Sequence, residues 1–188
     1  MNSPVSSGRI DELPRIVDQL RRAFEGDAWH GPSVLEALTG VNAKMAAAKP
    51  IPTAHSIWEI VEHIGAWDDA IRQRLNGRAL QLSPEQDWPA ISDSSNAAWI
   101  NSIDTLKKRH SDLCSAISAM PEQRLLAPVP GKDYDFYHML HGAVQHALYH
   151  AGQIVLLKKS SALAAQILHQ RVFNSATGAA KLLPPRTL

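Results

Sequence analysis

Apolar residues recur at steps of three and four in each long stretch of this 188-residue chain that lies between its Pro and Gly breaks. That spacing places them on one face of an α-helix, whereas a half-buried strand needs apolar and polar residues in alternation. The chain has no convincing run of alternation, and no Asn-Gly turn joins two β-branched runs. The sequence therefore predicts an all-α protein in which sheet is absent or minor.

The predicted helices begin and end at capping or helix-breaking residues. They cover residues 11–24, 34–45, 57–75, 96–120 and 134–159. The third is the best bounded, because Ser56 and Glu59 have capping-box spacing and Asn76-Gly77 tolerates a left-handed backbone after the helix. The turn-rich connection 78–93 is long enough to cross the end of a bundle. We expect a four-helix bundle with a broken N-terminal helix and one long crossover connection.

The length favours one domain with additions at its ends, since single domains cluster around ~100–150 residues. We assign residues 10–160 to the helical bundle and residues 1–9, a short polar stretch, to a flexible N-terminus. Residues 161–188 form a C-terminal extension of undefined structure. Within it, 162–172 could extend the last helix or form another.

Charge and cysteine content exclude several classes of partner. Nineteen Lys and Arg against eighteen Asp and Glu leave a formal charge of +1, so the basic surface that nucleic-acid binding needs is missing. One cysteine, Cys114, allows no intrachain disulfide and is predicted to be a buried core thiol. No stretch of about 18 apolar residues supports a membrane span. We therefore expect a cytoplasmic protein without nucleic-acid or membrane partners.

The nine histidines are the unusual part of the composition. His146 and His150 stand four residues apart, so on a helix they lie about 40° apart around the axis and about 6 Å apart along it. Both fall on the apolar stripe of their helix, and His63 falls on the apolar stripe of the helix that follows Ser56. Three buried imidazoles without partners would each cost ~1–3 kcal/mol. A shared cation would remove that cost.

Each histidine also has a less specific interpretation. A single inward histidine is more often a hydrogen-bonded core residue than a ligand, and only the third ring on another helix favours metal. His138 and His141 form a second face that we expect to be solvated or interfacial. His55 and His110 are predicted at helix ends or on the surface, and His169 is predicted in the tail. His30 is predicted either at the edge of a pocket or in a loop cap.

Three strings carry a resemblance to a known family. They are Trp-His-Gly-Pro-Ser at 29–33, the segment 55–64 with Trp67, and the His-x-x-x-His-Ala-Gly-Gln segment at 146–154. Over about residues 10–160 the chain resembles the DinB-like, YfiT-like superfamily of bacterial metal-binding four-helix bundles, which includes bacillithiol S-transferases and mycothiol-dependent maleylpyruvate isomerases. The family's metal ligands match His63, His146 and His150. Many relatives have Arg where this chain has Ala151, so any contact of that Arg with an anion does not carry over.

The resemblance implies a metal-dependent activity. Three imidazole ligands leave coordination positions open, as in catalytic sites, and suit zinc or nickel first, with iron also compatible. We predict a metal-dependent hydrolase or a thiol-dependent transferase acting on a small electrophile, with a low-molecular-weight thiol as one candidate substrate. One alternative is a non-enzymatic stress-associated or interaction module with a structural metal. Another is a metal-free helical adaptor in which the histidines hydrogen-bond one another. A homodimer is also expected.

Four residues near the open coordination positions are predicted to contact the substrate. They are His30, Trp67, Tyr149 and Gln153. For Gln153, one turn after His150, a plain packing or hydrogen-bonding role is equally compatible with the sequence. For Glu59, the capping-box role is favoured over support of His63.

Overall fold

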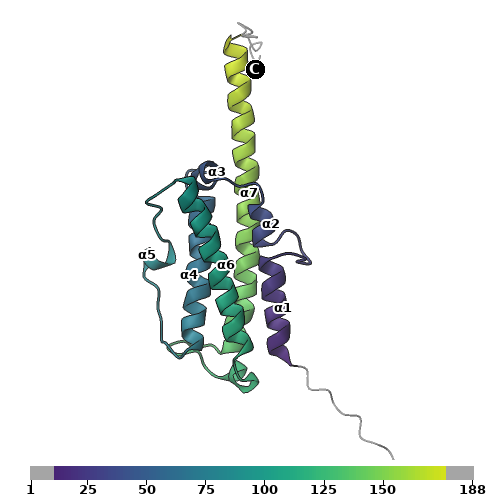
Figure 1. Cartoon of the computed structure of the whole chain (residues 1–188), viewed down its shortest axis with the longest axis vertical. Coiled ribbons are helices and arrows are strands. Elements are labelled where there is room, and N and C mark those ends of the chain that lie inside the picture. The colour runs from purple at the N-terminus through teal and green to yellow at the C-terminus, as the bar shows by residue number, and fades with distance from the viewer. Residues whose placement is uncertain (1–10, 177–188) are drawn as a thin grey trace, which may run out of the picture.

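The computed structural model describes residues 11–176 and shows an all-α architecture (Figure 1). The helices are α1 (Glu12–Phe24), α2 (Val34–Leu38), α3 (Ala43–Ala47), α4 (Ile57–Leu75), α5 (Pro84–Asp87), α6 (Asn96–Ser118), the 3-10 helix η1 (Glu122–Leu126) and α7 (Phe136–Ala176). In this part of the chain the only β contact is an isolated antiparallel bridge between Pro128 and Asp135. The predicted all-α class is confirmed.

The four long helices pack as a closed ring. α4 contacts α6 and α7, and α1 contacts the same two helices. Their apolar stripes meet in one core, which includes Ile16 of α1, Ile64 of α4, Leu113 of α6 and Ile154 of α7. Burial of each such side chain contributes roughly 1.5–3 kcal/mol, so the ring is held together mainly by these stripes.

Helix α4 begins and ends where the sequence predicts. The Ser56 hydroxyl accepts a hydrogen bond from the Glu59 amide, and the Glu59 carboxylate accepts one from the Ser56 amide at 2.7 Å. This capping box satisfies two amides that the first turn leaves without partners. After the helix, Gly77 has a φ of 87°, the left-handed conformation expected there. Between these boundaries, burial of Ile60 and Ile64 fixes the inward face of α4 and turns His63 toward the core.

Two predicted helices have different bounds in the structure. The segment 34–45 is not one helix but two short ones, α2 and α3, because Gly40 adopts a φ of 77° between them. The last helix does not end at Lys159 but continues to Ala176, since the alanine-rich stretch 160–176 contains neither Pro nor Gly. Figure 1 shows this part of α7 projecting beyond the bundle. Residues 1–10 and 177–188, which contain the predicted flexible N-terminus and the end of the extension, lie outside the described residues.

The long connection between α4 and α6 contains the one-turn helix α5. Ser83 and Gln86 form a capping box around it, and Pro84 occupies its first turn. α5 packs against α4, which brings the connection next to His63.

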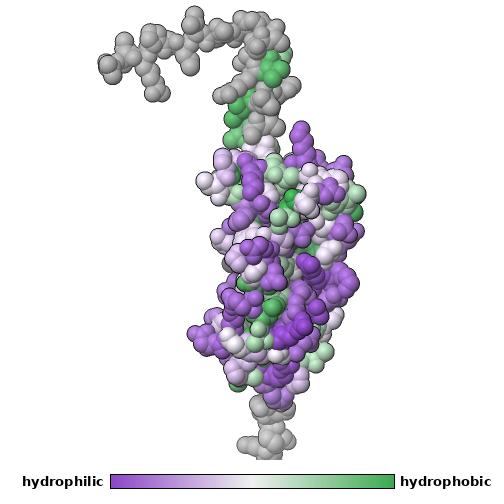
Figure 2. Space-filling model, turned by 90° about the vertical axis from the view of Figure 1, so that its left-hand side faces the viewer, coloured by the Kyte–Doolittle hydropathy of each residue, from purple (hydrophilic) through white to green (hydrophobic). Residues whose placement is uncertain are grey.

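Polar residues cover most of the face shown in Figure 2, and apolar residues show between them. Within residues 11–176 no helix has both the length and the apolar character to cross a membrane.

Candidate metal centre

Three histidine rings from two helices converge inside the bundle. His63 comes from α4, and His146 and His150 come from consecutive turns of α7. The Nε2 atom of His146 lies 3.0 Å from that of His63 and 3.1 Å from that of His150. His63 and His150 are buried, and His146 is partly buried. One nitrogen of each ring therefore faces a common point.

Two of these rings are held in place by hydrogen bonds at their Nδ1 atoms. His63 donates its Nδ1 hydrogen to the backbone carbonyl of Asp87 at 2.8 Å, and an Asp87 carboxylate oxygen lies 3.1 Å from the same nitrogen. His150 donates its Nδ1 hydrogen to the Oε1 atom of Gln153 at 2.6 Å. Such hydrogen bonds fix the tautomer of a ligating imidazole. They leave the Nε2 lone pairs of both rings directed at the common point.

The arrangement fits a bound cation. A neutral imidazole has a single N–H, and His63 and His150 use theirs on Asp87 and Gln153. Of the three rings, only His146 can carry its hydrogen on Nε2. That hydrogen can be donated to the Nε2 lone pair of His63 or of His150, so the other lone pair is left without a donor. In a tetrahedral site, ligand nitrogens at about 2.0–2.1 Å from a zinc ion lie about 3.3 Å from one another. The two separations from His146, 3.0 and 3.1 Å, are within a few tenths of an ångström of that value, and all three ligand atoms lie within 4.8 Å of one another.

The electrostatic environment keeps the rings neutral. Burial, with a further contribution from the neighbouring His150 and His63, lowers the pKa of His146 to about 3. Burial also lowers the pKa of His150 to about 4 and depresses that of His63. All three are therefore unprotonated near pH 7, which is the form that binds a metal.

An aromatic wall from the long connection closes one side of the cluster. The Trp88 ring stacks between His63, at a centroid distance of 3.8 Å, and His55, at 3.5 Å. Trp67 donates its indole hydrogen to the Asp87 carboxylate at 2.7 Å. The sequence reasoning missed Asp87 and Trp88. The available signal was the Ser-Pro-Glu-Gln string at 83–86, which predicts a capped turn just before them.

Two cavities adjoin the cluster. The first, of about 230 Å³, borders His146, and its lining also contains Trp67, Ile71, Arg74, Tyr134 and Met139. The second, of about 350 Å³, borders His150 and is mostly apolar; its lining also contains Ile60, Trp88, Tyr149, Gln153 and Leu157. Small molecules could therefore approach the three imidazoles from two sides.

The residues predicted to contact a substrate have different positions in the structure. Trp67 lines the first cavity, while Tyr149 and Gln153 line the second. His30 lies exposed in the loop between α1 and α2 and lines neither of these two cavities. Gln153 holds the His150 ring, so its observed contact is with a histidine. Substrate contact by any of the four stays a prediction.

One prediction about the other histidines is wrong. His110 is not a flanking or surface residue: it is buried between α6 and α4, where its Nδ1 lies 3.1 Å from the Asp68 carboxylate, and it stacks on Phe24. The spacing of His110 four residues after Leu106 was the signal for its burial. The predicted burial of Cys114 is confirmed, and its sulfur lies 3.6 Å from Nε2 of His110.

Fold and site together define a class of protein: a helical bundle whose clustered histidines fit a divalent metal. The chain belongs to the DinB superfamily, whose family model matches residues 28–154, about two thirds of the chain. The match includes all three histidines of the cluster and excludes α1. Neither the curated proteins nor the solved structures compared with the chain gave a match.

Proposed function

We propose that the protein is a metal-dependent enzyme that joins a thiol to a small electrophile, with His63, His146 and His150 as the ligands of a divalent ion. The observation that carries the proposal is the convergence of three Nε2 lone pairs at separations of 3.0 and 3.1 Å. Zinc or nickel suits this donor set best, and iron is also compatible. When bound, such an ion lowers the pKa of a coordinated thiol or water and so supplies a nucleophile at neutral pH.

The two cavities favour transfer between two organic molecules over hydrolysis. Hydrolysis requires one organic substrate and a water, whereas thiol transfer requires a thiol and an electrophile to meet at one point. The cavities border His146 and His150 respectively, so one could hold each reactant. Trp67 and Trp88 would orient the reactants and exclude water from the cluster.

The direct test is a rate measurement with the full chain. Protein loaded with zinc or nickel, given cysteine or glutathione and a fluorogenic alkyl halide such as monochlorobimane, should form the thioether faster than chelator-treated protein. Equal rates with and without metal, in samples with the same helical circular dichroism, would contradict an enzymatic role for the ion. Loss of the electrophile without loss of thiol would indicate hydrolysis. A large fall in melting temperature on chelation, with no turnover, would favour a structural ion.

Gln153 should control metal affinity through the His150 ring. Replacing Gln153 by Ala removes the acceptor of the Nδ1 hydrogen, and loss of such a partner costs about 10–100-fold in metal affinity. Gln153→Glu keeps an acceptor at that position and should bind metal nearly as tightly as the natural chain. Gln145→Ala, at an exposed position of the same helix, is the matched control. Competition titration with a zinc indicator measures all four; a Gln153→Ala affinity equal to that of Gln145→Ala would contradict the positioning role.

The expected homodimer is a separate prediction. Exposed apolar residues on the projecting part of α7, such as Leu163 and Ile167, are compatible with self-association. Sedimentation velocity of the purified chain measures the oligomeric state directly.

A further inference from the structure

Arg74 is a buried cation without a carboxylate partner. Its side chain is on the last turn of α4 and is 1% exposed. Its Nε and Nη2 atoms both donate to the backbone carbonyl of Leu80, at 3.2 and 3.0 Å. Among residues 11–176 it forms no ion pair, and Nη1 makes no hydrogen bond. A buried charge that is not paired is costly, so the site attracts an anion.

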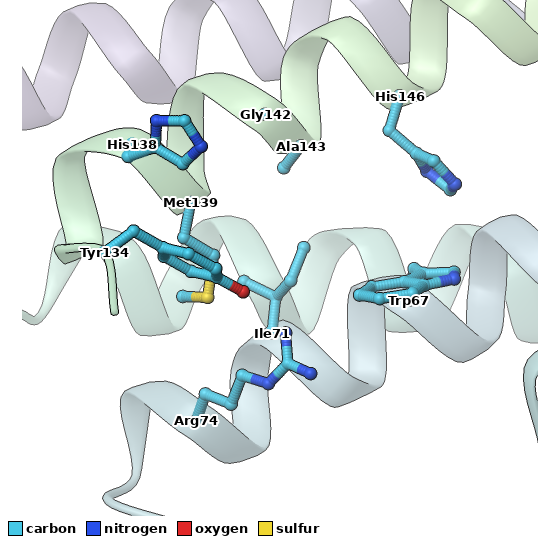
Figure 3. Close-up of a pocket in the computed structure, with 9 residues that line it drawn as sticks. All are labelled: Trp67, Ile71, Arg74, Tyr134, His138, Met139, Gly142, Ala143 and His146. Atoms are coloured by element: carbon cyan, nitrogen blue, oxygen red, sulfur yellow. The ribbon is translucent and has the colours of Figure 1, made fainter. Parts of the chain in front are cut away.

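The guanidinium borders the first cavity. Figure 3 shows the Arg74 head group and the Tyr134 hydroxyl directed into the space between α4 and α7. The Trp67 ring lies beside the guanidinium, with 5.4 Å between Cζ and the ring centroid. The same ring lies 5.9 Å from the ring of His146. The Trp67 ring therefore lines the cavity between its cationic end and the histidine cluster.

We propose that this cavity binds the carboxylate of a small substrate or cosubstrate, with Arg74 Nη1 and the Tyr134 hydroxyl as its donors. The identity of this molecule as a reactant rests on the proposed function, but carboxylate binding itself needs no metal. A carboxylate fits better than a phosphate, because the lining supplies few donors: one free guanidinium nitrogen, one hydroxyl and the His138 ring, besides the ring of His146. The remaining lining includes Ile71, Met139 and Ala143, so the ligand is a single charge on a compact, largely apolar body.

The geometry also places the reacting end of the ligand. A molecule whose carboxylate contacts Arg74 has Trp67 alongside it and reaches His146 at the other end of the same cavity. A cavity of about 230 Å³ admits only a small acid in this orientation. The second, apolar cavity is then left for the other reactant.

Binding of simple acids to the full chain tests the proposal. Acetate, propionate, butyrate and valerate would be titrated by calorimetry into chelator-treated and zinc-loaded protein, with butyramide as the neutral counterpart of butyrate. We expect at least one acid to bind both forms and butyramide to bind neither. Arg74→Gln should weaken binding at least about tenfold, since it removes a charge-assisted hydrogen bond. Arg74→Lys should retain part of the affinity.

Two further variants separate ligand binding from a structural role of Arg74 at Leu80. Arg72→Gln, two residues away and paired with Asp69 at a half-exposed position, removes the same charge and should leave binding unchanged. Gly142→Leu introduces a side chain into the cavity lining at a helical position where an added Cβ meets nothing within 4 Å. It should abolish acid binding while the helix content and Arg74 are retained.

The outcomes distinguish this inference from the proposed function. Acid binding that depends on Arg74 in chelator-treated protein supports the inference even if the chain fails to bind metal or to catalyse thiol transfer. Equal binding by Arg74→Gln and the natural chain, equal binding of butyramide and butyrate, unchanged binding by Gly142→Leu, or no binding of any of the four acids overturns it.

Discussion

A chain with both His146→Ala and His150→Ala should bind zinc or nickel more than about 100-fold more weakly than the natural chain. The reason is that two of the three converging Nε2 donors are removed, and loss of even an outer hydrogen-bonding partner of a metal ligand costs 10–100-fold. The natural chain should retain about one ion per chain after dialysis, as expected for a site of this kind. Elemental analysis of both proteins after identical dialysis measures the difference.

The matched control for this variant lies on the same helix. His138→Ala with His141→Ala makes the same chemical change at two histidines of α7 outside the cluster: His138 lines the first cavity beside Tyr134, and His141 lies 3.7 Å from the Glu12 carboxylate. It should keep the metal content of the natural chain. Equal metal content in the His146/His150 variant and the natural chain would end the metal-centre hypothesis.

Replacing Asp68 by Ala should lower the free energy of unfolding by about 3–5 kcal/mol. Asp68 and His110 form a buried pair between α4 and α6, and removal of one partner leaves the other without compensation in the core. Asp69→Ala is the control on the adjacent residue: Asp69 pairs with Arg72 at a half-exposed position, where a salt bridge contributes below about 1 kcal/mol. Urea unfolding of the three chains measures both values, and equal losses would contradict a special role for the buried pair.

The Asp68–His110 pair should also make the free energy of unfolding depend on pH in the alkaline range. Burial alone would lower the pKa of His110, but hydrogen bonds with Asp68 and Cys114 outweigh burial and raise it from 6.5 to about 9. Burial raises the pKa of the Asp68 carboxyl, and the charge on His110 opposes that rise. Because the folded pKa of His110 exceeds the unfolded one, its contribution is fully present below pH 6.5 and is lost as the pH rises through about 9. Asp68→Ala should lack this loss.

Local rules account for the part of the site that the sequence predicts. A helix repeats every 3.6 residues, so once Ile60 and Ile64 fix the inward face of α4, the direction of His63 follows. The same rule orients His146 and His150 on α7, and the capping box at Ser56 fixes where α4 begins. These features depend on residues within a few positions of one another.

Contacts between distant segments account for what the sequence missed. His110 meets Asp68 across 42 residues of chain, and neither residue carries a local signal for the other. His63 receives its acceptor from Asp87, 24 residues away, because α5 packs on α4. Arg74, on a helix end rich in charged residues, has the sequence pattern of a solvated side chain but is buried under the connection at Leu80.

The sequence by itself determined the helical class, the ends of α4 and the inward placement of the three clustered histidines, because each follows from helix periodicity and from capping within a few residues. Only the tertiary structure decided which atoms hold the imidazoles, where the cavities lie and which charges are buried. Those outcomes depend on how the connection and the four long helices pack, and packing brings together residues whose separation along the chain says nothing about their separation in space.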